Sequence, residues 1–161
     1  MQPGKIMVAD RGGAFVLKLL GDVRLSFCTA LDAYLDHMFA APDFASVVID
    51  LTEAENIDST TLGQLAKVAI ATQKRFNLHP VLLSTNPDIT RVLEAMGFAR
   101  VFDIRRECPC TREQLGELPM AAGTETAVRE RVLEAHQVLM GMNEKNRVQF
   151  KELVGALEAS R

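Results

Sequence analysis

Residues 47–63 read Val-Val-Ile-Asp-Leu-Thr-Glu-Ala-Glu-Asn-Ile-Asp-Ser-Thr-Thr-Leu-Gly, and this stretch decides the fold. It begins with a continuous apolar run over residues 47–51, which is typical of a strand covered on both faces of a sheet. A short loop is expected next. The hydroxyl-rich turn at residues 58–61 then precedes apolar residues that recur at helical spacing. The stretch therefore predicts a buried strand, a loop and the start of a helix.

The sequence on either side predicts strands and helices in alternation. Two short strands around residues 12–13, a glycine pair, are expected to form an antiparallel hairpin. Helices are expected after Ser26 and Asn86, which are suitable N-caps, and further strands at 81–84 and 101–104. Because helices that alternate with strands connect parallel strands by crossovers, we expect an α/β domain. Its mixed, mostly parallel sheet would have about five strands, with helices packed against it.

The composition changes after residue 105. Residues 106–123 contain several prolines and glycines, which predicts a linker. In residues 124–161, apolar side chains recur at spacings of three and four behind the candidate N-cap Thr124, which predicts a C-terminal helical extension. The pattern fits one long helix or a helical hairpin. Three domain ranges follow: 1–105, 106–123 and 124–161. The extension either folds back as a satellite core or forms a homodimer or a docking surface.

Charge and hydropathy exclude several classes of partner. The formal net charge is −3 and the basic residues are scattered, so neither nucleic acid nor an anionic membrane is an expected partner. The sequence has no apolar stretch long enough to cross a bilayer, and its first residues do not resemble a signal peptide. We therefore expect a cytoplasmic protein.

The residues that usually carry catalysis or bind metals are sparse. Cys28 lies in a helical apolar pattern and is expected in the core, whereas the Cys108-Pro109-Cys110 segment is interpreted as free thiols in a loop. The histidines, His37, His79 and His136, are far apart in sequence. There is no glycine-rich phosphate loop, nucleophile elbow or H-E-x-x-H motif. We expect no metal and no cofactor, and the protein is not expected to be an enzyme.

Residues 6–105 resemble the STAS domain family, whose members include bacterial anti-sigma factor antagonists. That family has an Asp-Leu pair at the end of its central strand, matched by Asp50-Leu51. It also has the sequence Asp-Ser-Ser/Thr-Gly-Leu-Gly at the following helix, matched by Asp58 to Gly63 except that Thr61 replaces the glycine. Residues 20–23 and 82–98 resemble the family's glycine-containing segment and its late strand and helix.

The resemblance implies that Ser59 is a phosphoacceptor, since in these antagonists the first serine after the aspartate carries the phosphate. A helix start favours this chemistry because its unpaired N–H groups and dipole tolerate an anion. A phosphate at this position would repel a docked partner. A loss of about 3–4 kcal/mol of binding free energy weakens the affinity several-hundredfold. We expect a phosphorylation-controlled switch for signal transduction and transcription regulation. With Ser59 unphosphorylated, the protein would bind an anti-sigma factor or a related kinase or phosphatase switch protein.

The partner-binding surface is expected on this turn and on the outward side of the following helix. Its candidate residues are Asp58, Ser59, Thr60, Thr61, Gln64, Lys67, Val68 and Ala71. The same residues also fit an ordinary solvated helix face on which Asp58 and Ser59 only cap the helix. A second functional hypothesis is a STAS scaffold or transport-associated subunit that acts through oligomerisation and needs no phosphate.

Overall fold

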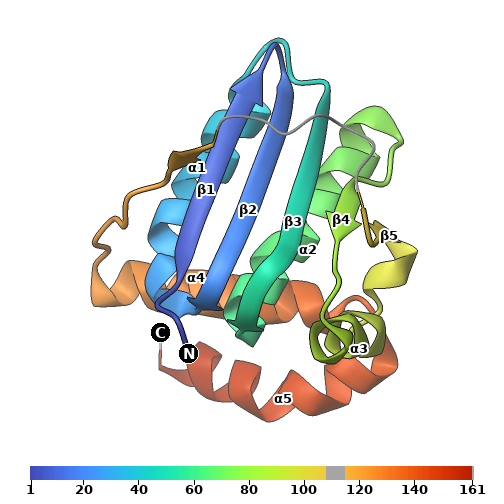
Figure 1. Ribbon diagram of the computed structural model, residues 1–161. Coiled ribbons are helices and arrows are strands. Elements are labelled where there is room, and N and C mark those ends of the chain that lie inside the picture. The colour runs from blue at the N-terminus through green and yellow to red at the C-terminus, as the bar shows by residue number, and fades with distance from the viewer. Residues whose placement is uncertain (108–114, 161) are drawn as a thin grey trace.

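The computed structural model describes residues 1–107 and 115–160, which form a six-stranded sheet in the order β5-β4-β3-β2-β1-β6 (Figure 1). The strands are β1 (Lys5–Arg11), β2 (Ala14–Val23), β3 (Ser46–Ile57), β4 (Val81–Leu83), β5 (Asp103–Arg105) and β6 (Gly116–Glu117). β1 is antiparallel to β2 and to β6, and the pairs from β2 to β5 are parallel. The predicted mixed, mostly parallel sheet is confirmed, with the two-residue β6 in addition.

Helices cover the far side of the sheet as it is seen in Figure 1, and the last one, at the C-terminus, lies below the sheet. In the described part of the chain they are α1 (Cys28–Ala40), α2 (Ser59–Phe76), α3 (Pro87–Ala95), α4 (Glu125–Met140) and α5 (Glu144–Ala159). Two short 3-10 turns, η1 (Leu25–Phe27) and η2 (Phe98–Arg100), precede α1 and β5. α4 packs against α2 and α1, and α5 packs against α4. Within residues 1–107 and 115–160, no helix combines the length and the apolar character needed to span a bilayer.

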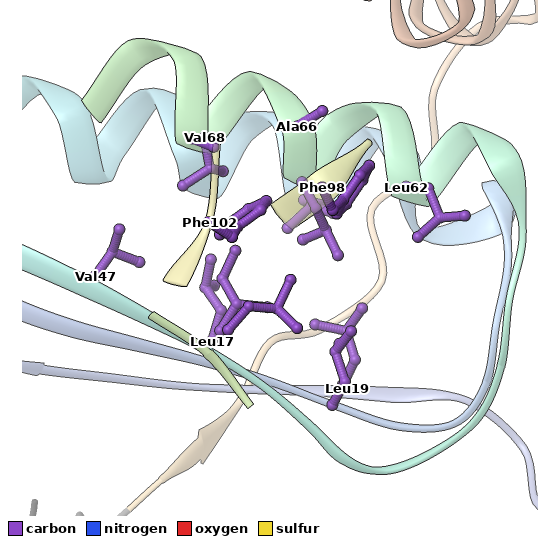
Figure 2. Close-up of a cluster of buried hydrophobic side chains, with 14 of the residues drawn as sticks. Leu17, Leu19, Val47, Leu62, Ala66, Val68, Phe98 and Phe102 are labelled. Atoms are coloured by element: carbon purple, nitrogen blue, oxygen red, sulfur yellow. The ribbon is translucent and has the colours of Figure 1, made fainter. Parts of the chain in front are cut away.

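The core lies between the sheet and α2 (Figure 2). Side chains from the sheet meet side chains from α2, and the stacked rings of Phe98 and Phe102, with centroids 5.5 Å apart, complete the cluster. The labelled members from the sheet and from α2 are Leu17, Leu19, Val47, Leu62, Ala66 and Val68. Cys28 is buried at 1% exposure, as expected from its place in an apolar stripe. Burial of this apolar surface fixes the position of α2 on the sheet.

β3 is longer than the sequence predicts. Residues 52–57 were expected to form a loop, but the strand continues through Ile57. The second half of β2 pairs with this segment in parallel, up to Val23 opposite Ile57, with irregular register on the way. Pairing therefore overrides the low strand propensity of Glu53, Ala54 and Glu55. As a result, the turn before α2 lies directly beside the end of β2.

Several predicted boundaries shift by a few residues. Ser26 lies inside η1, and α1 begins at Cys28 without a side-chain cap, so the expected Ser26 cap is wrong. Asn86 caps α3 as predicted, with its side chain accepting from the Asp88 N–H. The last predicted strand, residues 101–104, forms only at Asp103–Arg105 because the 3-10 turn η2 precedes it and Phe102 points into the core.

The C-terminal extension is a helical hairpin that folds back on the helix layer. Thr124 caps α4 as predicted, accepting from the Ala127 N–H at 3.0 Å. α5 begins at Glu144, behind its own cap Asn143. Leu139 and Phe150 join the main core cluster, so the hairpin packs on the domain itself. The expectation for Cys108 and Cys110 lies outside the described residues.

Candidate functional site

Asp58 is the N-cap of α2 and links the helix to η1. Its Oδ1 accepts a hydrogen bond from the Thr61 N–H at 2.9 Å, and its Oδ2 accepts one from the Leu25 N–H at 2.7 Å. The Asp58 N–H donates to the Val23 carbonyl at the end of β2. The carboxylate thus ties α2 to η1, and the Asp58 backbone ties both to the end of β2. Of the two residues considered as caps of this helix, Asp58 occupies the cap position and Ser59 does not.

Ser59 is the first residue of α2, and its hydroxyl contacts a histidine from the C-terminal hairpin. Ser59 Oγ lies 2.8 Å from His136 Nε2. The other ring nitrogen, Nδ1, lies 2.7 Å from the Val132 carbonyl oxygen, which can only accept. In the neutral ring Nδ1 therefore donates to Val132, and Nε2 accepts the hydrogen bond from the Ser59 hydroxyl. Ser59 is half-buried, whereas His136 is 2% exposed.

α4 crosses α2 at Gly63, four residues after Ser59. A Cβ atom at Gly63 would lie 2.2 Å from the Ala135 carbonyl oxygen, far inside van der Waals contact. The two helix backbones therefore touch at this point, and only glycine permits that approach. This contact places His136, the next residue of α4, against the start of α2.

A cluster of four charged side chains joins α1, α2 and α4 beside this crossing. Lys67 Nζ pairs with Asp32 Oδ1 at 3.3 Å and also with Glu134. Arg131 Nε pairs with Asp32 Oδ2 at 2.8 Å. Burial by itself would lower the pKa of Lys67, but the hydrogen bond to Glu134 and the charge of Asp32 outweigh it. The pKa of Lys67 is therefore raised.

A second polar group surrounds the ends of β2 and β3. Asp22 accepts from Arg24 Nε at 2.9 Å and from Asn56 Nδ2 at 2.9 Å. The hydrogen bond from Arg24, followed by the one from Asn56, lowers the pKa of Asp22. The carboxylate stays ionised close to the turn that carries Ser59, so the surface there has charges of both signs.

The structure gathers the predicted partner-binding residues around α2 but buries half of them. Thr60, Thr61, Gln64 and Val68 are each at most 3% exposed, and Asp58, Ser59, Lys67 and Ala71 are half-buried. The expectation of an outward, exposed face is wrong for Gln64 and Val68. Gln64 donates to the Cys28 carbonyl of α1, and Val68 points into the core (Figure 2). What remains partly accessible is Asp58 and Ser59 on the turn and the edge bearing Lys67 and Ala71.

Asp50, the other motif aspartate, lies away from this turn. Its Oδ1 accepts from the Thr52 N–H at 2.9 Å and from the Thr52 hydroxyl at 2.6 Å, in the middle of β3. At about 3.3 Å per residue, the strand separates Asp50 from Asp58 by roughly 25 Å. The two aspartates therefore do not form a pair. Across residues 1–107 and 115–160 there is no cluster of three or more His, Cys, Asp or Glu that could hold a metal ion.

Sequence reasoning missed the residues that the C-terminal hairpin brings to the site: His136, Arg131 and Glu134. One signal was available, since His136 lies beside Ala135 in the apolar stripe of the extension. A glycine within the helical pattern, Gly63, was a second hint that another backbone comes close. Neither signal predicts that the helix carrying His136 packs against the helix carrying Gly63.

A mixed sheet with helices against it, and a capped helix start directly after the longest strand, define an α/β domain of the STAS type. The chain belongs to the STAS domain family, because the family model described as "Mlab, STAS domain" matches residues 6–105. No curated protein matches the chain. A crystal structure of an uncharacterized protein from the DUF3478 family with a SpoIIAA-like fold, from Shewanella loihica PV-4, is similar. It shares 12% identity at a TM-score of 0.46, covering 65% of this chain and 87% of that one.

Proposed function

We propose that the chain is a cytoplasmic, non-enzymatic protein-binding switch of the anti-sigma-factor-antagonist kind, controlled by phosphate on Ser59. Unphosphorylated, it sequesters an anti-sigma factor or a related partner-switching regulator. The observation that carries the proposal is the position of Ser59 as the first residue of α2, half-buried, on a turn that Asp58 fixes. A rigid turn presents the same surface to each binding partner, and a single phosphate on Ser59 would change that surface.

The helix start suits a phosphate without unfolding the domain. Backbone N–H groups of a first turn lack partners within the helix, and the helix dipole is positive there. Asp58 already satisfies the N–H of Thr61, so the cap does not depend on the Ser59 hydroxyl. Adding about −1.5 to −2 charges at Ser59 therefore changes the docking surface more than the fold.

Variants of Ser59 test the switch. The natural partner is first identified by co-purification, and its affinity is then measured for wild type, Ser59→Ala and Ser59→Asp. We expect Ser59→Asp to bind about 100-fold more weakly or worse, and Ser59→Ala to bind, since only the first carries charge. Ser160→Asp, an exposed position at the end of α5, is the matched control for an added carboxylate. If both Ser59 variants bind like wild type, phosphate control is excluded.

A second candidate is a scaffold or transport-associated STAS subunit that never carries phosphate and acts through oligomerisation. The hydrogen bond between Ser59 and His136 favours it, because the hydroxyl already has an internal partner. Phosphosite mapping by mass spectrometry under two growth conditions separates the two functions. Ser59 without phosphate in both, together with a homodimeric mass in solution, supports the scaffold.

A further inference from the structure

We propose that α4 is a built-in competitor for the partner, occupying the docking surface at the start of α2 when no partner is bound. The proposal rests on the proposed function and adds its regulation. Glu134, Ala135 and His136 of α4 contact the side of α2 that carries Ser59, Gly63 and Lys67. A visiting protein that docks on this side has to displace α4 first.

The contact at Gly63 shows how closely α4 fits. Since a Cβ at Gly63 would stand 2.2 Å from the Ala135 carbonyl oxygen, no side chain and no water layer separates the two backbones there. A partner helix that docks on this side of α2 would need the same space. The occupant of the docking surface in the closed chain is therefore α4 itself.

Through the hydrogen bond between Ser59 and His136, α4 also covers the candidate phosphoacceptor. His136 is 2% exposed and its Nε2 is 2.8 Å from Ser59 Oγ, so there is no room for a phosphoryl group between them. A kinase needs this oxygen free of His136. Closure by α4 thus opposes both partner docking and phosphoryl transfer.

The charged cluster explains how the closure is reversible. Beside Gly63, α4 is held by Arg131 and Glu134, whose side chains are 39% and 44% exposed. The other ends of these pairs, Asp32 and Lys67, are 11% and 33% exposed, so the Arg131 and Glu134 ends are the ones that a partner's charges can reach. An acidic or basic partner can therefore replace them with its own charges. Only molecules in which α4 has left this side of α2 can bind the partner. The apparent affinity is therefore the intrinsic affinity multiplied by the fraction of such open molecules.

A glycine variant tests the closure in the full chain. Gly63→Ala inserts the Cβ that collides with Ala135 but raises the helix propensity of α2 itself. Gly155→Ala is the matched control, because nothing lies within 4 Å of a Cβ at that position of α5. Each is combined with Ser59→Cys in a background where Cys108 and Cys110 are replaced by serine, and iodoacetamide labelling of the thiol introduced at position 59 is timed. The buried Cys28 is common to both chains.

We expect Gly63→Ala to accelerate labelling at position 59 about tenfold or more over Gly155→Ala, with faster amide exchange in α4. Should Gly63→Ala fail to fold, Glu134→Lys, which places a like charge opposite Lys67, is expected to accelerate labelling by a smaller factor. Unchanged labelling and unchanged α4 exchange in the folded variant would overturn the competitor proposal. Faster labelling in a protein whose Ser59→Ala and Ser59→Asp variants bind like wild type would instead leave closure intact and reject phosphate control.

Discussion

Asp58 Oδ2 accepts a hydrogen bond from the Leu25 N–H at 2.7 Å, across 33 residues of sequence. The same carboxylate caps α2, so one side chain positions both the candidate phosphoacceptor and the start of η1. The role of Asp58 as a cap and its role in presenting Ser59 are therefore the same role. A turn held this way keeps its shape while a partner comes and goes.

Replacing Asp58 tests this double role. Asp58→Ala leaves two backbone N–H groups without their acceptor and should lower the free energy of unfolding by about 1–3 kcal/mol. Asp58→Asn keeps one carbonyl oxygen and should lose less, because asparagine is also a good N-cap. Urea unfolding measures both. Asp88→Ala is the control, since its exposed ion pair with Arg91 contributes little; equal losses in Asp58→Ala and Asp88→Ala would contradict the bridging role.

Local sequence chemistry was sufficient to predict much of the fold. Apolar runs and caps such as Val47–Leu51 and Asn86 act within a few residues, so their structure can be predicted from the sequence. Residues 52–57 could not be, because their strand conformation comes from pairing with β2, not from their own propensity.

The candidate site divides in the same way. The helix start at Ser59 follows from a local motif, as predicted. The burial of Gln64 and Val68 depends on where α1 and the core lie, and the approach of His136 depends on how a hairpin 77 residues away folds back. Such long-range contacts leave only weak marks in one sequence.

The hydrogen bond between Ser59 and His136 should be measurable in stability. Ser59→Ala removes the donor and leaves the buried Nε2 of His136 unsatisfied, which should cost about 1–3 kcal/mol of unfolding free energy. Ser160→Ala, at an exposed C-terminal position, should change it by less than about 0.5 kcal/mol. Denaturant unfolding compares the two. A Ser59→Ala protein as stable as wild type would mean that the hydroxyl is not needed to satisfy His136.

Lys67 should make stability depend on alkaline pH. Its pKa is raised in the fold, so its contribution is fully present below the ordinary lysine value of about 10.4 and is lost as pH rises through the folded pKa. Lys67→Met removes this contribution and should therefore be less stable than wild type at neutral pH, with a gap that narrows above about pH 10.4.

Thermal unfolding from pH 7 to 11 measures that gap. Lys74→Met, also on α2 but exposed, serves as the control for the loss of one positive charge. A Lys67→Met gap that stays constant over this range would show that the ion pairs with Asp32 and Glu134 do not couple to folding.

A variant of Asn146 tests whether α5 keeps α4 docked against α2. It is fully buried, and its Nδ2 donates to the Met96 carbonyl at 2.9 Å and to the Leu139 carbonyl at 2.9 Å, joining α5 to the end of α3 and to α4. Asn146→Ala removes both donors and leaves a small cavity, so we expect a loss of about 2–3 kcal/mol and faster amide exchange along α4 and α5. Gln149→Ala, exposed on the same helix, should change neither. Since α4 reaches Ser59 only while the hairpin is docked, Asn146→Ala combined with Ser59→Cys should also speed thiol labelling at position 59. Faster exchange in α5 with unchanged labelling would show that α4 holds its place without α5.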